Sequence, residues 1–312
     1  MRATLLSQWL RECKENHPQC SKVVLSGLPS RLLKIDDDPY GGSVRLEMYE
    51  EGPHFPEYVT LSHCWGTQAH PIRMTSDNID RFRQSVLTSE LPATFRDAAA
   101  VVRSIGLHHL WIDSLCIVQN DLLDWQTESA KMGSIYENSV LTIAASSATD
   151  ATEGCTLDLE EIATQHRGWV LQEMILSRRI LHFTKQQVYW QCRELAESED
   201  GCLHEATSVD EAKQSSRIML RQNTTFTSDI RRLWWVWCMD YSRRLFTVPA
   251  DRLYACAGIT QYYNHLHGEE AVVLGLRRDR LLSELLWLLV NHRAAPRIAA
   301  AGLPSWTWLS RQ

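Results

Sequence analysis

Short apolar runs alternate with amphipathic stretches along the first two thirds of the chain. Residues 58–62, 110–113 and 140–145 each have the length and composition of a buried strand. Between them, residues 94–105 and 124–138 carry apolar side chains at helical spacing. Strands that are apolar on both faces and separated by helices are typical of a parallel sheet covered on both sides. The pattern therefore predicts an α/β fold.

The pattern continues with one more helix, two more strands and a polar stretch. Residues 167–176 predict the helix, and 179–184 and 187–192 predict the strands. Residues 194–223 are polar and acidic, which indicates a loop or linker. Three helical patterns follow, at 228–242, 250–262 and 276–291.

These elements divide the chain into four expected segments. Residues 1–54 form a lead-in helix and linker, and residues 55–195 form an α/β core with a flavodoxin-like parallel sheet and flanking helices. Residues 196–224 form a polar loop or linker, and residues 225–312 form a helical region packed on the core. A length of 312 residues fits about two domains.

Composition excludes several classes of protein. Lys and Arg number 32 against 38 Asp and Glu, so the net charge is −6, and the chain lacks the basic excess that coats nucleic acid or an anionic membrane. Hydrophobic residues make up 44% and charged residues 22%, as in globular proteins. Residues 281–290 are interrupted by Glu284 and are too short to span a membrane. We therefore expect a soluble protein that does not bind membranes.

The nine cysteines and twelve tryptophans add two expectations. Residues 1–12 lack the apolar length of a signal peptide, so we expect a cytoplasmic protein with unpaired thiols. Tryptophan buries a large surface and keeps one N–H that needs a partner. We expect a packing cluster that docks the helical region on the sheet, formed by Trp234, Trp235, Trp237, Trp306 and Trp308.

Several motifs follow one another in an order that resembles a known family. They are YVTLSHCWG at 58–66, LPATFRDA at 91–98, LWIDSLCI at 110–117, LTIAA at 141–145 and RGWVLQE at 167–173. In this order and spacing they resemble the fungal heterokaryon incompatibility (HET) domain, and the resemblance covers nearly the whole chain. Two features depart from the family pattern: His63 replaces the usual Tyr, and the stretch between Gly154 and Arg167 is shorter than usual.

The HET family's proposed distant kinship with TIR domains implies a TIR-like sheet and a site on the helix at 167–176. In TIR-type NAD hydrolases the catalytic Glu lies on a helix shortly after a Trp-Cys pair, and Trp169-x-x-x-Glu173 looks like that arrangement. A carboxylate can stabilise oxocarbenium-like charge while the nicotinamide–ribose bond breaks, and an indole can stack on the base. Arg167 and Gln172 lie beside this pair as substrate-binding candidates. Alternatively, Glu173 forms a structural salt bridge with Arg167 or Arg178 under a core Trp169.

Ser62, His63, Cys64 and Trp65 follow the first predicted strand, where open α/β sheets form their ligand crevice. A Cys–His nucleophile pair is disfavoured, because adjacent residues of a strand point to opposite faces. We expect Ser62 and Gly66 to form a tight loop, with Trp65 either lining a pocket or packing in the core.

Asp113, Ser114 and Cys116 follow the second predicted strand. Asp113 can hold a ribose hydroxyl or a substrate ammonium group, or it can cap the following turn through backbone N–H groups. Cys116 is interpreted as a buried small hydrophobic residue rather than a nucleophile. Because strand ends share one edge of the sheet, we expect this motif to converge with 58–66 and 167–173.

Glu128, Met132 and Tyr136 share one stripe of a predicted helix, at intervals of four residues. Met132 and Tyr136 are expected in the core. A carboxylate on that stripe needs a partner, which Arg96 or Arg103 can supply.

Cys13, His17 and Cys20 have the residue types of zinc ligands and lie on one stripe of a helix. Only three ligands are visible, and no CxxC pair occurs elsewhere to complete the set. We therefore favour an ordinary amphipathic lead-in helix and expect no metal. No cofactor is expected, and NAD enters only as a candidate substrate.

Three functions remain open. The first is a cell-death or incompatibility effector that hydrolyses an NAD-type nucleotide, with Glu173 as the key carboxylate and Asp113 as a second catalytic residue. The second is a non-catalytic HET interaction module, and the third is a HET-type enzyme of small-molecule biosynthesis. We favour an enzyme whose partner is a small molecule or nucleotide, and homo-oligomerisation stays open.

Overall fold

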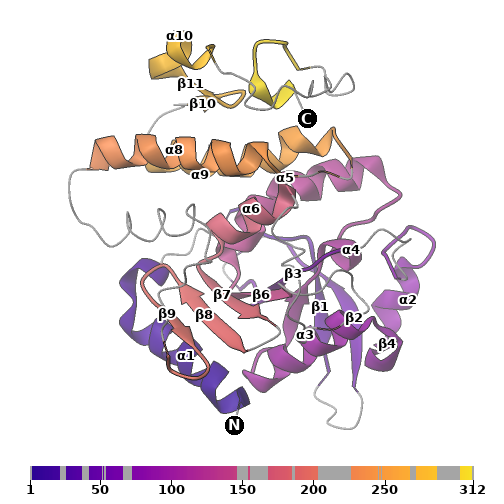
Figure 1. The fold of residues 1–312 in the computed structure, drawn as a ribbon. Coiled ribbons are helices and arrows are strands. Elements are labelled where there is room, and N and C mark those ends of the chain that lie inside the picture. Colours follow the sequence, from indigo (N-terminus) through magenta and orange to yellow (C-terminus); the bar gives the residue numbers. More distant parts are fainter. Residues whose placement is uncertain are drawn as a thin grey trace. The chain divides into compact units, whose positions relative to one another are not determined.

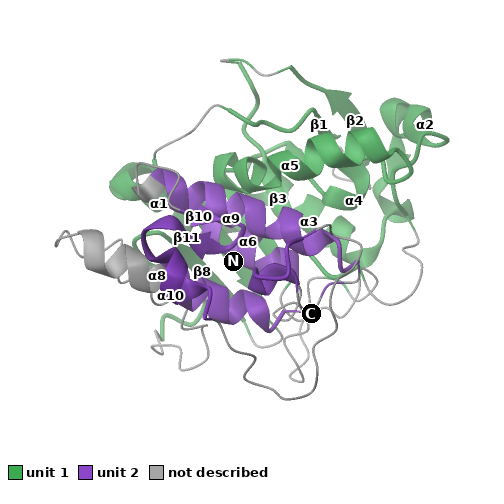
Figure 2. Ribbon diagram, turned by 90° about the horizontal axis from the view of Figure 1, so that it is seen from above, with its two compact units in different colours: residues 1–165, 177–208 green, residues 166–176, 209–312 purple. Residues whose placement is uncertain are grey.

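The computed structural model describes residues 2–21, 26–36, 42–50, 52, 54–65, 72–145, 154, 168–184, 187–202, 226–244, 246, 248–267, 272–286 and 303–310. The chain divides into two compact units (Figure 2). The first comprises residues 1–165 and 177–208, and the second comprises residues 166–176 and 209–312. The four expected segments stay a prediction; the helix at 168–176, expected within the core, is grouped with the second unit. Among the helices described, none combines the length and the apolar character needed to cross a membrane.

The first unit is built on a nine-stranded sheet, with helices on its faces (Figure 1). The strands are β1 (Arg31–Ile35), β2 (Ser43–Met48), β3 (Val59–Ser62), β4 (Val86–Leu87), β5 (His109–Trp111), β6 (Leu141–Ala145), β7 (Arg179–Phe183), β8 (Val188–Cys192) and β9 (Ala196–Ser198). The helices are α1 (Arg2–Asn16), η1 (Pro18–Cys20), α2 (Ile79–Gln84), η2 (Thr88–Glu90), α3 (Ala93–Ser104), α4 (Asp113–Cys116) and α5 (Leu122–Asn138). The α/β class is confirmed.

The strand order is β4-β2-β1-β5-β3-β6-β7-β8-β9. Only the central strands β5, β3, β6 and β7 run parallel, and every other neighbouring pair is antiparallel. Numbered by their order in the chain, the parallel strands are arranged 2-1-3-4, which is a flavodoxin-like order. The expected wholly parallel sheet is therefore confirmed at its centre and corrected at both sides.

Three of the antiparallel strands, β1, β2 and β9, come from segments expected to be linker or loop. Residues 1–54 contain β1 and β2, which pair with each other across a short connection. Ala196–Ser198, at the start of the expected polar loop, forms β9 and pairs with β8. Antiparallel pairing needs only a short connection, so a polar strand can join an edge without a strong apolar signal.

Helices α3 and α5 cover opposite faces of the sheet (Figure 1). The chain passes from β3 through α3 to β5 on one side, then through α5 to β6 on the other side. Right-handed crossovers in opposite directions place their helices on opposite faces. Phe95 and Val102 of α3 and Ile135 and Tyr136 of α5 are buried, as their helical spacing predicts. The sheet is thus covered on both faces, and α1 adds to one of them through Trp9, whose ring lies 6.2 Å from that of Trp190 on β8.

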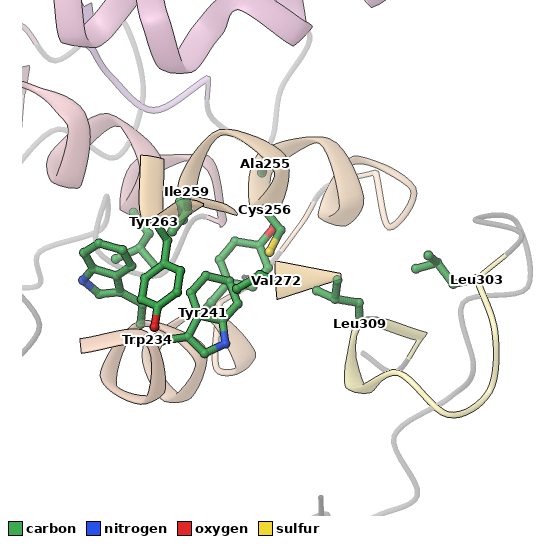
Figure 3. Close-up of a cluster of buried hydrophobic side chains, with 11 residues drawn as sticks. Trp234, Tyr241, Ala255, Cys256, Ile259, Tyr263, Val272, Leu303 and Leu309 are labelled. Atoms are coloured by element: carbon green, nitrogen blue, oxygen red, sulfur yellow. The ribbon is translucent and has the colours of Figure 1, made fainter. Parts of the chain in front are cut away.

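The second unit contains α6 (Gly168–Leu176), α8 (Phe226–Ser242), α9 (Asp251–His267), the hairpin β10 (Val272–Val273) and β11 (Leu276–Arg277), and the short helices η4 (Arg278–Arg280), α10 (Leu281–Glu284) and η6 (Trp308–Ser310). Its core is an apolar cluster in which the ring centroids of Trp234 and Tyr263 lie 5.0 Å apart (Figure 3). Trp237 belongs to this cluster and Trp308 packs against it, whereas the side chains of Trp235 and Trp306 are 47% and 41% exposed. The expected tryptophan cluster is therefore the core of this unit, without those two members.

The helix expected at 276–291 begins later than its leucine spacing indicates. Leu274 and Gly275 both have positive φ values, of 48° and 81°, and reverse the chain between β10 and β11. Positive φ at both central residues is typical of the two-residue turns that join the strands of a hairpin. The hairpin takes Leu276 and Arg277 out of the helix, so α10 starts at Leu281. Residues 287–291 lie outside the described part of the chain.

Candidate functional site

The polar residues that follow β3 and β5 lie at one edge of the sheet. The two strands are neighbours and run parallel, with Val59 opposite Leu110 and Thr60 opposite Trp111. Their carboxyl ends therefore meet, and the residues after β3 lie next to the start of α4. The expected convergence of 58–65 with 110–119 is confirmed by this register, while Gly66 lies outside the described residues.

Asp113 is the centre of this edge. Its Oδ2 accepts a hydrogen bond from Trp65 Nε1 at 2.8 Å, and its Oδ1 accepts one from the Ser114 backbone N–H at 2.7 Å. The Oδ1 atom also lies 3.8 Å from Nδ1 of His63. The Asp113 carboxylate thus caps the turn that follows it, which is one of the two roles that the sequence offers. Its hydrogen bond from Trp65 also links the end of β5 to the end of β3. Its side chain is 18% exposed, which leaves it accessible to a ligand.

His63 lies buried between Asp113 and helix α3. Its ring makes an edge contact with Phe95, with centroids 4.9 Å apart and planes at 90°. The 3.8 Å spacing between His63 Nδ1 and Asp113 Oδ1 is longer than a hydrogen bond but short enough for an electrostatic interaction between the carboxylate and the imidazole ring. His63 is one of the two positions at which the sequence departs from the pattern that the resemblance implies.

Ser62, Cys64, Ser114 and Cys116 line the buried side of the same edge. All four are at most 5% exposed. Burial raises the pKa of the Cys116 thiol to about 12. Because the thiolate is the nucleophilic form, this shift argues against Cys116 as a nucleophile at neutral pH. It behaves as the buried hydrophobic residue that the sequence indicates.

A buried ion pair fixes the segment that carries Asp113. Arg31 on β1 pairs with Asp124 on α5 at 2.6 Å, and its Nε donates to the Cys116 carbonyl at 2.7 Å. Asp124 also accepts a hydrogen bond from the Val118 backbone N–H at 2.8 Å. This pair was not predicted from the sequence, because Arg31 begins a strand that lies in the expected linker. The pair holds the C-terminal end of the turn that begins at Asp113.

Glu128 has partners other than those expected. Its carboxylate accepts hydrogen bonds from the Ser30 hydroxyl at 2.7 Å and from Lys131 at 3.0 Å. The expectation of Arg96 or Arg103 as its partner is wrong, because Ser30 lies just before β1, a strand that the sequence analysis did not predict.

Trp169, Gln172 and Glu173 lie on α6 in the second unit, whereas Asp113 lies in the first. Gln172 and Glu173 are buried, at 2% and 4% exposure, and Trp169 packs against the apolar cluster. Trp169 Nε1 donates to Asp251 Oδ2 at 3.4 Å. Convergence of α6 with the sheet edge stays a prediction, and Arg167 lies outside the described residues.

The contact between α6 and α9 requires a glycine. A Cβ atom at Gly258 would lie 2.4 Å from Nε2 of Gln172. The amide of Gln172 is thus held against the backbone of α9, which fixes the rotation of α6 about its axis.

Asp251→Asn is expected to stabilise the protein at neutral pH. Burial raises the pKa of Asp251, and the hydrogen bond from Trp169 offsets this only in part. The folded state therefore binds more protons than the unfolded state between the ordinary and the raised pKa, so stability falls as pH rises through that interval. Asn keeps an acceptor for Trp169 and carries no charge. The melting temperature of the variant should exceed that of the wild type at pH 7, and the difference should shrink at about pH 3. A variant that melts lower than wild type at pH 7 would contradict this.

Cys13, His17 and Cys20 come together as the sequence indicates, and the structure adds a fourth residue. Cys192, at the end of β8, lies beside them, and the four potential ligand atoms are within 4.8 Å of one another. None of the eight cysteines described forms a disulfide. The fourth residue was invisible in the sequence, because it comes from a strand far along the chain.

Comparison with known proteins finds one family match. Residues 58–166 match the family model described as Heterokaryon incompatibility protein (HET). The matched segment contains β3, β5, β6 and the edge built around Asp113. No curated protein and no solved structure matches the chain.

Proposed function

We propose that this chain, whose residues 58–166 match the HET family model, is a HET-type enzyme that hydrolyses an NAD-type nucleotide. The reaction breaks the bond between nicotinamide and ribose. Nicotinamide leaves with the bonding electron pair, water adds to the ribose carbon, and one proton is released. Glu173 is the key carboxylate of this proposal, and Asp113 is the second functional acid.

The strand order is the observation that carries the proposal. In a sheet of order 2-1-3-4, the crossover helices change faces between the first and third parallel strands, which here are β3 and β6. Ligands of open α/β sheets, nucleotides among them, bind at the carboxyl ends of the strands at this point. Asp113, His63 and Trp65 lie at the carboxyl end of β3 or of its neighbour β5.

The chemistry of these residues supports a ribosyl substrate. The Asp113 side chain is 18% exposed, and each carboxylate oxygen has a second lone pair that can accept a hydrogen bond from a ribose hydroxyl. The transition state of glycosidic cleavage carries positive charge on the ribose, which a preorganised carboxylate stabilises. Glu173 supplies that carboxylate in the proposal, and Trp169 supplies a planar surface for a base.

Incubation of the purified full-length chain with NAD tests the proposal directly. Mass spectrometry should find nicotinamide and ADP-ribose in equal amounts, increasing with time and with protein concentration. ATP, which has no nicotinamide, should remain unchanged and serves as the control. Unchanged NAD in the presence of folded protein would contradict the proposal, and the interaction module and the biosynthetic enzyme would then be the remaining functions.

A further inference from the structure

Four potential metal ligands from two distant parts of the chain converge in the first unit. His17 and Cys192 are 175 residues apart in sequence, yet His17 Nδ1 lies 3.3 Å from Cys192 Sγ. Together with Cys13 and Cys20, their ligand atoms all lie within 4.8 Å of one another. We propose that Cys13, His17, Cys20 and Cys192 bind one Zn²⁺ ion as a structural Cys₃His site.

The size and composition of the cluster fit tetrahedral zinc. With Zn–S bonds of about 2.3 Å and Zn–N bonds of about 2.0–2.1 Å, the ligand atoms of a tetrahedral site are about 3.5–4 Å apart. The four ligand atoms already lie within 4.8 Å of one another, so small movements of the side chains are enough to reach these separations. Three sulfur ligands and one imidazole favour zinc over Mg²⁺ or Ca²⁺, which prefer oxygen ligands. A full set of four protein ligands is typical of structural rather than catalytic zinc.

The end of α1 presents three of the ligands on one side. The His17 backbone N–H donates to the Cys13 carbonyl at 3.2 Å, which continues the helical direction by one turn. The following turn η1 closes with the Cys20 N–H bonded to the His17 carbonyl at 3.0 Å. Cys13 and Cys20 are both 0% exposed. These backbone bonds, and not the metal, already bring the three side chains together, so little ordering is needed on binding.

The turn after β8 prepares Cys192 as a thiolate ligand. The backbone N–H groups of Glu194 and Leu195 donate to its sulfur, at 3.4 and 3.2 Å. Hydrogen bonds to the charged form of a group stabilise that form. The Glu194 side chain in turn accepts the Gln19 N–H at 2.7 Å, which joins this turn to η1. The fourth ligand is therefore held in place from both sides of the cluster.

Arg179 provides a second and independent observation. It is 3% exposed, and its Nε donates to Cys13 Sγ at 3.1 Å. Its remaining contacts are carbonyl oxygens, at Val140 and Cys20, and among the described residues it has no carboxylate partner. A buried guanidinium needs a counter-charge. Zn²⁺ with three thiolates and a neutral imidazole carries a net charge of −1, so the proposed site supplies that counter-charge.

Metal content of the full-length protein is the first test. Protein expressed in zinc-supplemented medium and dialysed into metal-free buffer should contain about one zinc per chain. Cys192→Ser should reduce this at least about tenfold. The matched control is Cys202→Ser, because Cys202 is exposed, lies near the same hairpin and is not part of the cluster. It should keep its zinc.

Cobalt substitution tests the site even where Cys192→Ser does not fold. Wild-type protein reconstituted with Co²⁺ should show a thiolate-to-cobalt charge-transfer band and the intense visible bands of tetrahedral coordination. Cys192→His, which keeps a ligand, should retain cobalt with a weakened charge-transfer band. Wild-type protein without zinc and without these bands, zinc retained in a folded Cys192→Ser variant, or a native disulfide between two of the three cysteines would each overturn the proposal. None of these readouts depends on nucleotide hydrolysis.

Discussion

Glu173→Gln is expected to hydrolyse the NAD-type substrate about 10²–10³ times more slowly than the wild type, which is the usual cost of removing one preorganised electrostatic contact. Gln keeps the size of Glu and part of its hydrogen bonding, but it removes the negative charge that would oppose the developing ribosyl cation. Steady-state release of nicotinamide, at substrate concentrations that give both kcat and KM, measures the effect. The loss should be in kcat.

The melting curve separates a catalytic Glu173 from a structural one. Glu173 is 4% exposed, so a structural role predicts that Glu173→Gln lowers the melting temperature together with any loss of activity. A catalytic role predicts an unchanged melting curve and a slow enzyme. Trp169→Ala should instead weaken substrate binding and cost about 3–5 kcal/mol of stability, because Trp169 packs against the apolar cluster. Full activity of Glu173→Gln would eliminate the proposed role.

Asp124→Ala should lower the free energy of unfolding by about 3–5 kcal/mol, the usual cost of breaking a buried ion pair by removing one partner. The substitution leaves the Arg31 side chain, which is 6% exposed, without its carboxylate. It also removes the acceptor of the Val118 backbone N–H. Urea denaturation followed by tryptophan fluorescence measures the change.

Asp121→Ala is the matched control for that measurement. Asp121 precedes α5, three residues before Asp124, and its side chain accepts the backbone N–H groups of Leu123 and Asp124. Loss of such a helix cap typically costs about 1 kcal/mol. If Asp124→Ala costs no more than Asp121→Ala, the Arg31–Asp124 pair does not anchor the turn that carries Asp113.

The centre of the fold could be predicted from the sequence because its strands are buried on both faces. β3 and β6 are buried at every position, so their apolar and β-branched residues give a strong signal. β1 and β2 carry charged residues and belong to the antiparallel side of the sheet, and the sequence analysis placed them in a linker. The helix expected at 276–291 was placed too early for a similar reason. A left-handed turn at Leu274 cannot be recognised from the residue type.

The candidate site was predictable as a list of residues but only partly as a geometry. Asp113 and Trp65 follow separate strands, and the rule that parallel strands end at one edge was enough to bring them together. The partners that fix this edge, Arg31 and Asp124, depend on a strand that was not predicted. Cys192 depends on tertiary contact across most of the chain, which periodicity does not report.

The pairings of β5 with β1 and of β6 with β7 have a consequence for the segment that matches the HET family model. Residues 58–166 contain both strands, but β5 also pairs with β1 and β6 also pairs with β7, and both partners lie outside the segment. A fragment cut at these limits would have two apolar strands with unsatisfied edges, a form that aggregates readily. A gene fusion that kept only residues 58–166 is therefore expected to yield an aggregation-prone product, because it would separate β5 from β1 and β6 from β7.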